Sequence, residues 1–144
     1  MRSYQGGCHC GAVKVVFENA VVPADLEIRS CGCGFCTRHG ARTITDPAGH
    51  LELHAAGDAA MIYRFAMGIT DFIICRACGC YMGALMEDDD DLFGIVNSRM
   101  LDDRGCFDGA ATSRDYSAED EEGRRARRRA TWTPVTWRHD TDVA

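Results

Sequence analysis

The chain has no long apolar run. None of its stretches reaches the roughly 20 apolar residues of a membrane-spanning helix, and its first seven residues, MRSYQGG, lack the apolar segment of a signal peptide. Lysine is also nearly absent, since Lys14 is the only one and arginine supplies the other basic side chains. With 16 basic and 22 acidic residues, the formal net charge of −6 argues against nucleic acid as a partner. We therefore expect a cytoplasmic protein in a reducing setting, with neither a membrane nor a nucleic acid as its partner.

The chain has 144 residues, of which 46% are hydrophobic. This length is enough for one domain with a core and too short for two independent ones. No internal repeat of fixed period is present. We expect residues 1–110 to form a β domain that binds metal, and residues 111–144 to add a helix and a tail packed on the same domain. The expected assembly is a monomer or a homodimer.

Alternation of apolar and polar residues predicts strands along most of the chain. In residues 12–18, Val13, Val15 and Phe17 alternate with other residues, which is typical of a strand with one buried face. Similar patterns predict strands over residues 42–46, 50–54, 61–65, 69–75, 81–86 and 92–97. The acidic run at 87–91 is interpreted as the solvated tip of a hairpin, because it lacks the spaced ligands of a calcium loop.

One helix is predicted near the C-terminal end. Ser117 and Asp120 form a variant capping box, acids fill the first turn and arginines fill the last. The pairs Asp120–Arg124 and Glu121–Arg125 have the favourable spacing of four residues. We interpret the five arginines of this helix as a solvated face paired with the helix's own acids, rather than as a phosphate-binding patch.

Most of the nine cysteines fall into three short motifs. The motifs are CxC at residues 8–10, CxCxxC at 31–36 and CxxC at 75–78, with Cys80 next to the last motif and Cys106 alone. Such spacing is typical of metal ligands rather than of a disulfide framework. Neither of the common ferredoxin spacings is present, so zinc is favoured over an iron–sulfur cluster.

The central motif is predicted to bind zinc through Cys31, Cys33 and Cys36. Residues two apart in an extended strand point to the same face, and a turn through the next two residues can bring Cys36 to the first two thiols. A disulfide across one intervening residue would be strained, and three thiols cannot all pair. The site then has three protein ligands and an open fourth position, or alternatively His39 closes it as the fourth ligand.

The two outer motifs together supply a closed set of four thiolates. Cys8 and Cys10 converge at the start of a strand, and Cys75 and Cys78 follow the end of a distant one. Four thiolates are the arrangement of a structural zinc site, which would tie the two strands together. Cys80 is an alternative ligand in place of Cys78.

An open site with three thiolates constrains its chemistry. Zinc brings two positive charges and the thiolates three negative ones, so the centre is a weaker Lewis acid toward water than a zinc held by histidines. Hydrolysis is therefore disfavoured, whereas a soft ligand such as a thiol is favoured. A bound thiol would lose its proton and become a nucleophile toward a small electrophile. The predicted chemistry is thiol addition or transfer.

Four sequence features in combination resemble one known family. They are GCHCGAV at residues 7–13, CxCxxC at 31–36 followed by Arg38 and Gly40, CRACG at 75–79, and the step Val96-Asn97. From about residue 6 to residue 101, the chain resembles the glutathione-dependent formaldehyde-activating enzyme family, which includes centromere protein V.

This resemblance implies a mostly β fold, antiparallel and of the β-tent kind, with two zinc ions per chain. The implied structural ligands are Cys8, Cys10, Cys75 and Cys78, and the implied catalytic ligands are Cys31, Cys33 and Cys36. The activity of the family joins glutathione and formaldehyde into S-hydroxymethylglutathione, which is classed as carbon–sulfur lyase chemistry. The implied partner is thus a small-molecule thiol such as glutathione, with formaldehyde or a similar aldehyde as the second substrate.

Other polar residues near the motifs are candidates for contacts with the thiol. Arg38, Arg42 and Arg76 either bind a glutathione carboxylate in bidentate fashion or pair with local acids. Asn97 either orients a ligand by hydrogen bonding or holds a structural turn. Tyr63 and Tyr81 are expected in the core rather than in catalysis.

The alternative function is a non-catalytic zinc module that binds a protein partner through its sheet. The fourth ligand of the central motif separates the two functions. A site closed by His39 favours the binding module, and a site open to a cleft favours the enzyme.

Overall fold

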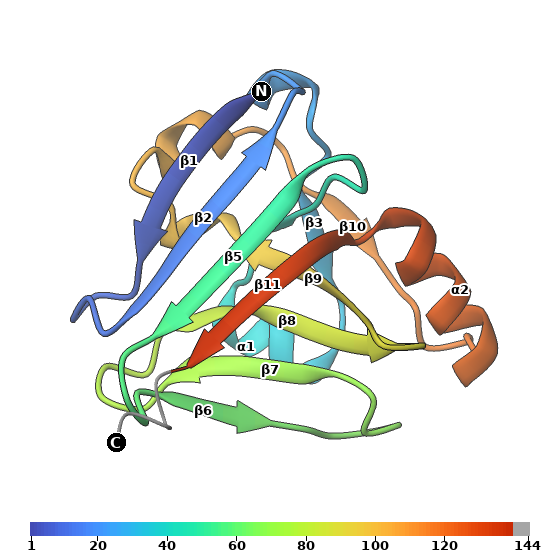
Figure 1. Ribbon diagram of the computed structural model, residues 1–144. Coiled ribbons are helices and arrows are strands. Elements are labelled where there is room, and N and C mark those ends of the chain that lie inside the picture. Colours follow the sequence, from blue (N-terminus) through green and yellow to red (C-terminus); the bar gives the residue numbers. More distant parts are fainter. Residues whose placement is uncertain (140–144) are drawn as a thin grey trace.

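The fold is mostly β with a short helix near its C-terminal end, as predicted. The computed structural model describes residues 1–139 (Figure 1). The strands are β1 (Arg2–Gly7), β2 (Val13–Asn19), β3 (Arg29–Cys31), β4 (Thr43–Ile44), β5 (His50–Ala55), β6 (Ala60–Tyr63), β7 (Asp71–Cys75), β8 (Tyr81–Asp88), β9 (Asp91–Asn97), β10 (Thr112–Arg114) and β11 (Thr133–His139). The α-helices are α1 (Gly34–His39) and α2 (Glu121–Thr131), and short 3-10 turns span Pro23–Asp25, Ser98–Met100 and Arg104–Phe107.

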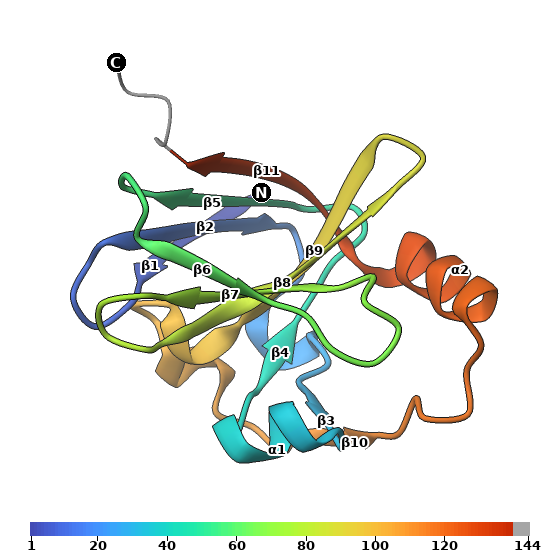
Figure 2. The same ribbon diagram turned by 90° about the horizontal axis from the view of Figure 1, so that it is seen from below.

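All the strands predicted from alternation are present as β2 and β4 to β9, with ends shifted by a few residues. The strands join into one open mixed sheet. Strands β1, β2, β5 and β11 form one layer, and β6 to β9 cross beneath it as a second layer (Figure 2). Every pairing is antiparallel except those of β3 with β10 and β5 with β11, so the fold is mostly antiparallel as predicted. Strand β11 also pairs with β9 and thereby links the two layers.

The core lies between these layers and contains the predicted buried face of β2. Val13, Val15 and Phe17 are at most 1% exposed. Phe17 pairs in register with Leu51, and Val15 pairs with Leu53, both buried on β5. Complete burial of one such side chain contributes roughly 1.5–3 kcal/mol. These buried contacts hold β2 and β5 together and so fix the position of the turns at their ends.

The β8–β9 hairpin is confirmed, and its acidic tip also contacts α2. Asp89 and Asp90 form the exposed turn, each with a positive φ. Asp88 accepts hydrogen bonds from Arg125 at 3.2 Å and from Arg129 at 2.9 Å. The tip is therefore solvated only in part, because the carboxylates of Asp88 and Asp91 pair with arginines on the outer side of α2.

Helix α2 begins later than predicted. Asp120 rather than Ser117 is its N-cap, and the Asp120 carboxylate accepts a hydrogen bond from the backbone of Gly123 at 2.7 Å. The predicted pair of Glu121 with Arg125 is confirmed at 3.1 Å. Asp120 is occupied by the cap, which leaves Arg124 to pair elsewhere. Capping by a carboxylate at the first turn needs no serine upstream.

Residues 133–139 belong to the same sheet as the N-terminal strands, because β11 pairs with β5 and β9. The division at residue 110 stays a prediction, and the predicted packing of the tail beyond residue 139 lies outside the described residues. No helix in the described part of the chain has the length and apolar character needed to cross a membrane.

Candidate metal centres and the adjoining cavity

Four thiols from two turns that are far apart in the sequence meet at one point. Cys8 and Cys10 lie in the turn between β1 and β2, Cys75 ends β7, and Cys78 lies in the turn that follows. Their sulfur atoms all lie within 4.8 Å of one another. Cys80 is not part of this set. The structure thus brings together the four thiols that the spacing predicted as one closed set.

The sulfur–sulfur distances in this cluster fit a zinc ion. A tetrahedral zinc with Zn–S bonds of about 2.3 Å places its sulfurs about 3.8 Å apart. The distances from Cys10 Sγ are 3.7 Å to Cys8 Sγ and 3.6 Å to Cys75 Sγ. The turn after β7 depends on Gly79, whose φ of +78° is one that glycine adopts without strain. All nine cysteines are free thiols, so no disulfide competes for these sulfurs.

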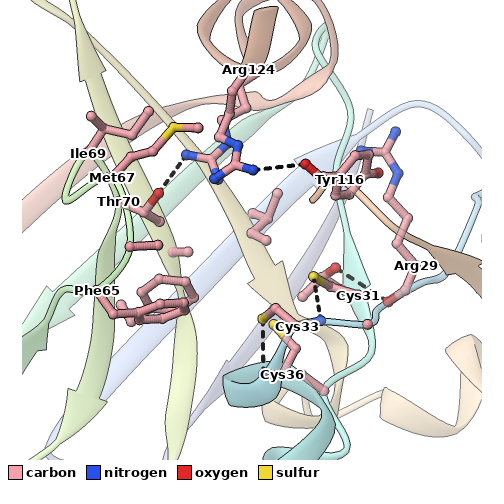
Figure 3. A pocket seen from close by; sticks show the side chains of 18 of the residues that line it. Arg29, Cys31, Cys33, Cys36, Phe65, Met67, Ile69, Thr70, Tyr116 and Arg124 are labelled. Atoms are coloured by element: carbon pink, nitrogen blue, oxygen red, sulfur yellow. Dashed lines mark hydrogen bonds between the residues drawn. The ribbon is translucent and has the colours of Figure 1, made fainter. Parts of the chain in front are cut away.

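Three further thiols meet where β3 passes into α1. Cys31 ends β3, Cys33 is the N-cap of α1, and Cys36 lies in the first turn of the helix. Their sulfurs also lie within 4.8 Å of one another. The backbone N–H of Cys33 donates to Cys31 Sγ at 3.5 Å, and that of Cys36 donates to Cys33 Sγ at 3.3 Å (Figure 3). Hydrogen bonds of this kind stabilise thiolates, the form that binds metal.

The electrostatics within this cluster are strongly coupled. Hydrogen bonding from the Cys36 thiol lowers the pKa of Cys31 to about 5, and it raises the pKa of Cys36 itself. Cys31 therefore ionises readily, whereas Cys36 keeps its proton and donates it in a hydrogen bond to the Cys31 thiolate. A cation bound among the three sulfurs would replace this proton as the partner of the negative charge.

The structure does not place His39 in the three-thiol cluster. His39 is exposed, and its ring packs against the ring of Phe35 with centroids 4.5 Å apart. Among the described residues, the set of close ligand atoms contains only Cys31, Cys33 and Cys36. The geometry corresponds to the open arrangement of three thiols rather than to the closed alternative.

The three thiols line one end of a cavity of about 430 Å³. This volume is in the range of small-molecule sites, roughly 300–1,000 Å³. Aromatic and aliphatic side chains form the middle of its wall, namely Phe65, Phe72, Tyr81, Ile95 and Trp132. Figure 3 shows Arg124 and Thr70 across the cavity from the three cysteines. The cavity thus runs from a cluster of thiols, past an apolar wall, to an arginine-bearing helix.

Comparison with known proteins agrees with this geometry. The family model described as "Glutathione-dependent formaldehyde-activating enzyme" matches residues 3–118, which include all the thiols of both clusters. The chain belongs to the glutathione-dependent formaldehyde-activating enzyme family. The resemblance inferred from the cysteine motifs is thereby confirmed.

The chain is also similar to a Rhodobacter sphaeroides protein of known crystal structure. The two are 28% identical with a TM-score of 0.59, and the matched region covers 76% of this chain and 99% of that one. The family match ends before α2. The family match therefore includes the two thiol clusters, whereas the arginine-bearing helix lies beyond the matched segment.

The polar residues that the motifs nominated do not line the cavity of this family member. Arg38 is exposed and bonds the backbone of its own helix. Arg42 and Arg76 donate to backbone carbonyls elsewhere in the chain. Asn97 is buried, and its amide donates to the backbone oxygen of Tyr81 at 3.0 Å. Asn97 thus supports a cavity-lining residue, and direct contacts of Arg38 and Asn97 with a ligand stay predictions.

The arginines of α2 divide between two environments, which the prediction of a solvated helix face did not anticipate. Arg124, Arg127 and Arg128 line the cavity, whereas Arg125 and Arg129 face the acidic hairpin tip. The spacing i, i+3, i+4 of the first three places them on one helix face. That spacing is visible in the sequence, but the burial of this face is not.

Tyr81 is a core residue, as expected, and it also lines the cavity beside the three thiols. The prediction for Tyr63 was wrong, because its side chain on β6 is 46% exposed. The Tyr81 hydroxyl is buried and has no hydrogen-bond partner among the protein atoms of the described residues. Burial raises the pKa of Tyr81 well above its usual value, and the negative charge of the neighbouring cysteine cluster adds to the rise. The hydroxyl therefore stays protonated and is available as a hydrogen-bond donor.

Proposed function

We propose that this protein joins a low-molecular-weight thiol such as glutathione to formaldehyde or a similar small aldehyde, as a carbon–sulfur lyase of the S-(hydroxymethyl)glutathione synthase type. The observation that supports it is the position of Cys31, Cys33 and Cys36 at the wall of a ligand-sized cavity. We propose two zinc ions per chain, one structural and one at these thiols. When bound there, zinc would supply a site for the incoming sulfur and lower the pKa of that thiol.

The reaction needs a polarised aldehyde as well as a thiolate. A C–S bond forms while the π bond of the carbonyl breaks, the thiol loses its proton and the aldehyde oxygen gains one. Negative charge therefore develops on this oxygen. Tyr81 lines the cavity, and its buried hydroxyl is a protonated donor that has no protein partner within residues 1–139. We assign it the hydrogen bond to the aldehyde oxygen, which it would strengthen as the charge grows.

The rest of the chain suits this function. The apolar wall formed by Phe65, Phe72 and Trp132 limits water around a reactive aldehyde. Free thiols throughout the chain agree with the reducing, cytoplasmic location that we propose. The ion pairs of Arg125 and Arg129 with Asp88 leave the outer face of α2 without a free arginine patch, in keeping with a partner other than nucleic acid.

Cobalt substitution tests the proposed function directly. We expect the visible spectrum of the cobalt-loaded protein to change on saturation with glutathione, because a fourth sulfur would join the three from the chain. S-methylglutathione, which has no ionisable thiol, serves as the matched control and should leave the spectrum unchanged. A spectrum indifferent to saturating glutathione would contradict the proposal, whatever rate of adduct formation is observed, since thiols add to formaldehyde unaided.

Substitution Tyr81→Phe should separate catalysis from stability. We expect kcat for adduct formation to fall about 100- to 1,000-fold, the usual range for loss of one donor to a developing oxyanion. The cobalt spectrum should still respond to glutathione. Stability should be unchanged or higher, because the lost hydroxyl is buried without a protein partner. Exchange NMR would measure the rate of adduct formation, and thermal unfolding would measure the stability. An unchanged kcat would remove Tyr81 from the reaction.

A further inference from the structure

Arg128 is a buried cation at the wall of the cavity. Its side chain lies on α2 and is 8% exposed, and it lines the cavity together with Arg124 and Arg127. One guanidinium nitrogen of Arg128 donates to Thr70 Oγ1 at 2.6 Å, and the guanidinium lies 4.2 Å from the ring centroid of Trp132. These contacts fix the position of the charge without neutralising it.

No acidic side chain within the described residues pairs with Arg128. Glu119 is the carboxylate whose charge acts on Arg128. Both of its oxygens are occupied, by Arg127 at 2.7 and 3.0 Å and by Arg124 at 3.3 Å. The Nε atom of Arg128 is buried and has no hydrogen-bond partner in the part of the chain that the structure describes. Burial, followed by the like charges of Arg127 and Arg124, lowers the pKa of Arg128 to about 10, which still leaves it charged at neutral pH.

A buried charge without an ionic partner is costly to keep, and arginine is the side chain best suited to bidentate contacts with a carboxylate. Figure 3 shows where the charge lies, because Thr70, the hydrogen-bond partner of Arg128, is across the cavity from Cys31, Cys33 and Cys36. An occupant that reaches the thiols with one end can reach Arg128 with the other.

We propose that Arg128 is the centre of an anion-binding site, completed by Arg124 and Arg127, that takes a carboxylate of the thiol substrate. The assignment of the carboxylate to a thiol rests on the proposed function. The selected class is a peptide thiol with a carboxylate remote from its sulfur, rather than a small neutral thiol. The apolar wall between the two ends would contact the middle of such a molecule.

This site and the metal-binding thiols come from different parts of the chain. The family match over residues 3–118 contains Cys31, Cys33 and Cys36, whereas Arg128 lies on α2 beyond it. In this proposal the thiols that bind metal and the arginine that selects the substrate lie in separate segments of the chain. The anion site can therefore be tested with a ligand that has no thiol.

The test uses the sulfur-free peptide γ-glutamyl-alanyl-glycine, which keeps the carboxylates of glutathione, and its diethyl ester, which lacks them. Isothermal titration of the zinc-loaded protein should show binding of the peptide and at least tenfold weaker binding of the ester. Arg128→Gln should weaken peptide binding at least tenfold and leave ester binding unchanged. Arg129→Gln, on the same helix but paired with Asp88 outside the cavity, is the matched control and should change neither.

Equal binding of peptide and ester by the unmodified protein would overturn the anion site, and so would equal weakening of both by Arg128→Gln, because that result reports packing alone. Arg124→Gln provides a second variant at a less buried position, with a smaller loss expected for the peptide only. The outcome is separable from that of the proposed function. Peptide binding without a cobalt response to glutathione leaves the anion site and removes the thiol chemistry, and the reverse result removes only the anion site.

Discussion

Cys33→Ser is expected to remove one of two zinc ions per chain and to reduce adduct formation to the uncatalysed rate. Serine keeps an oxygen that can accept from the backbone of Cys36, as Cys33 Sγ does at 3.3 Å, so α1 retains its N-cap. It does not replace a thiolate as a soft ligand, so the metal is lost. Cys33 lies at the cavity wall and is only half-buried. Its loss should therefore leave the core intact.

Metal analysis together with circular dichroism measures this result. Cys106→Ser is the matched control, because Cys106 is exposed and lies outside both clusters; it should leave zinc content and rate unchanged. If Cys33→Ser unfolds the protein, the central site is structural and the non-catalytic binding module becomes the better description. An unaltered zinc content would show that Cys33 is not a ligand.

Cys75→Ser is expected to remove the other zinc and to destabilise the whole domain. Cys75 is 1% exposed, and its sulfur lies 3.6 Å from Cys10 Sγ, a residue 65 positions away. Zinc in structural sites binds with apparent free energies of about 10–16 kcal/mol, which is coupled to folding. A loss of only about 5 kcal/mol would lower the Tm by roughly 15 °C for a domain of this size. We expect a fall of at least that amount, or failure to fold.

Thermal unfolding of the zinc-loaded proteins measures this effect, with Cys80→Ser as its control. Cys80 lies beside the cluster but outside its set of close sulfurs, so its substitution should change Tm by only a few degrees. A large fall with Cys80→Ser and a small one with Cys78→Ser would exchange the two as ligands. A stable Cys75→Ser protein with full zinc content would contradict the closed four-thiol site.

The strands and the two thiol clusters were predictable because their signals are local. The alternation at Val13, Val15 and Phe17 reports burial of one face within a single strand, and the spacing of the cysteines reports convergence within a single turn. The pairing of the first and third motifs followed from the number of ligands that zinc needs. Helix α1 was missed because six residues are too few for a helical pattern to show.

The cavity was not predictable, because it depends on contacts between distant segments. Arg128 meets Thr70 across 58 residues, and this contact exists only because α2 leads into β11, which pairs with both layers of the sheet. Sequence spacing placed Arg124, Arg127 and Arg128 on one side of a helix without revealing what that side covers. Likewise, the apolar setting of Tyr81 predicted its burial and gave no sign of its unpaired hydroxyl.

The arginines of helix α2 have different surroundings on its outer and inner faces. Outward, Arg125 and Arg129 are matched by the carboxylates of the hairpin tip; inward, Arg128 stays unmatched. A protein that is acidic overall can in this way keep a positive interior while its exterior repels polyanions. At the proposed anion site, discrimination among anions would then depend on size, since only a molecule small enough to enter the cavity meets the positive charge.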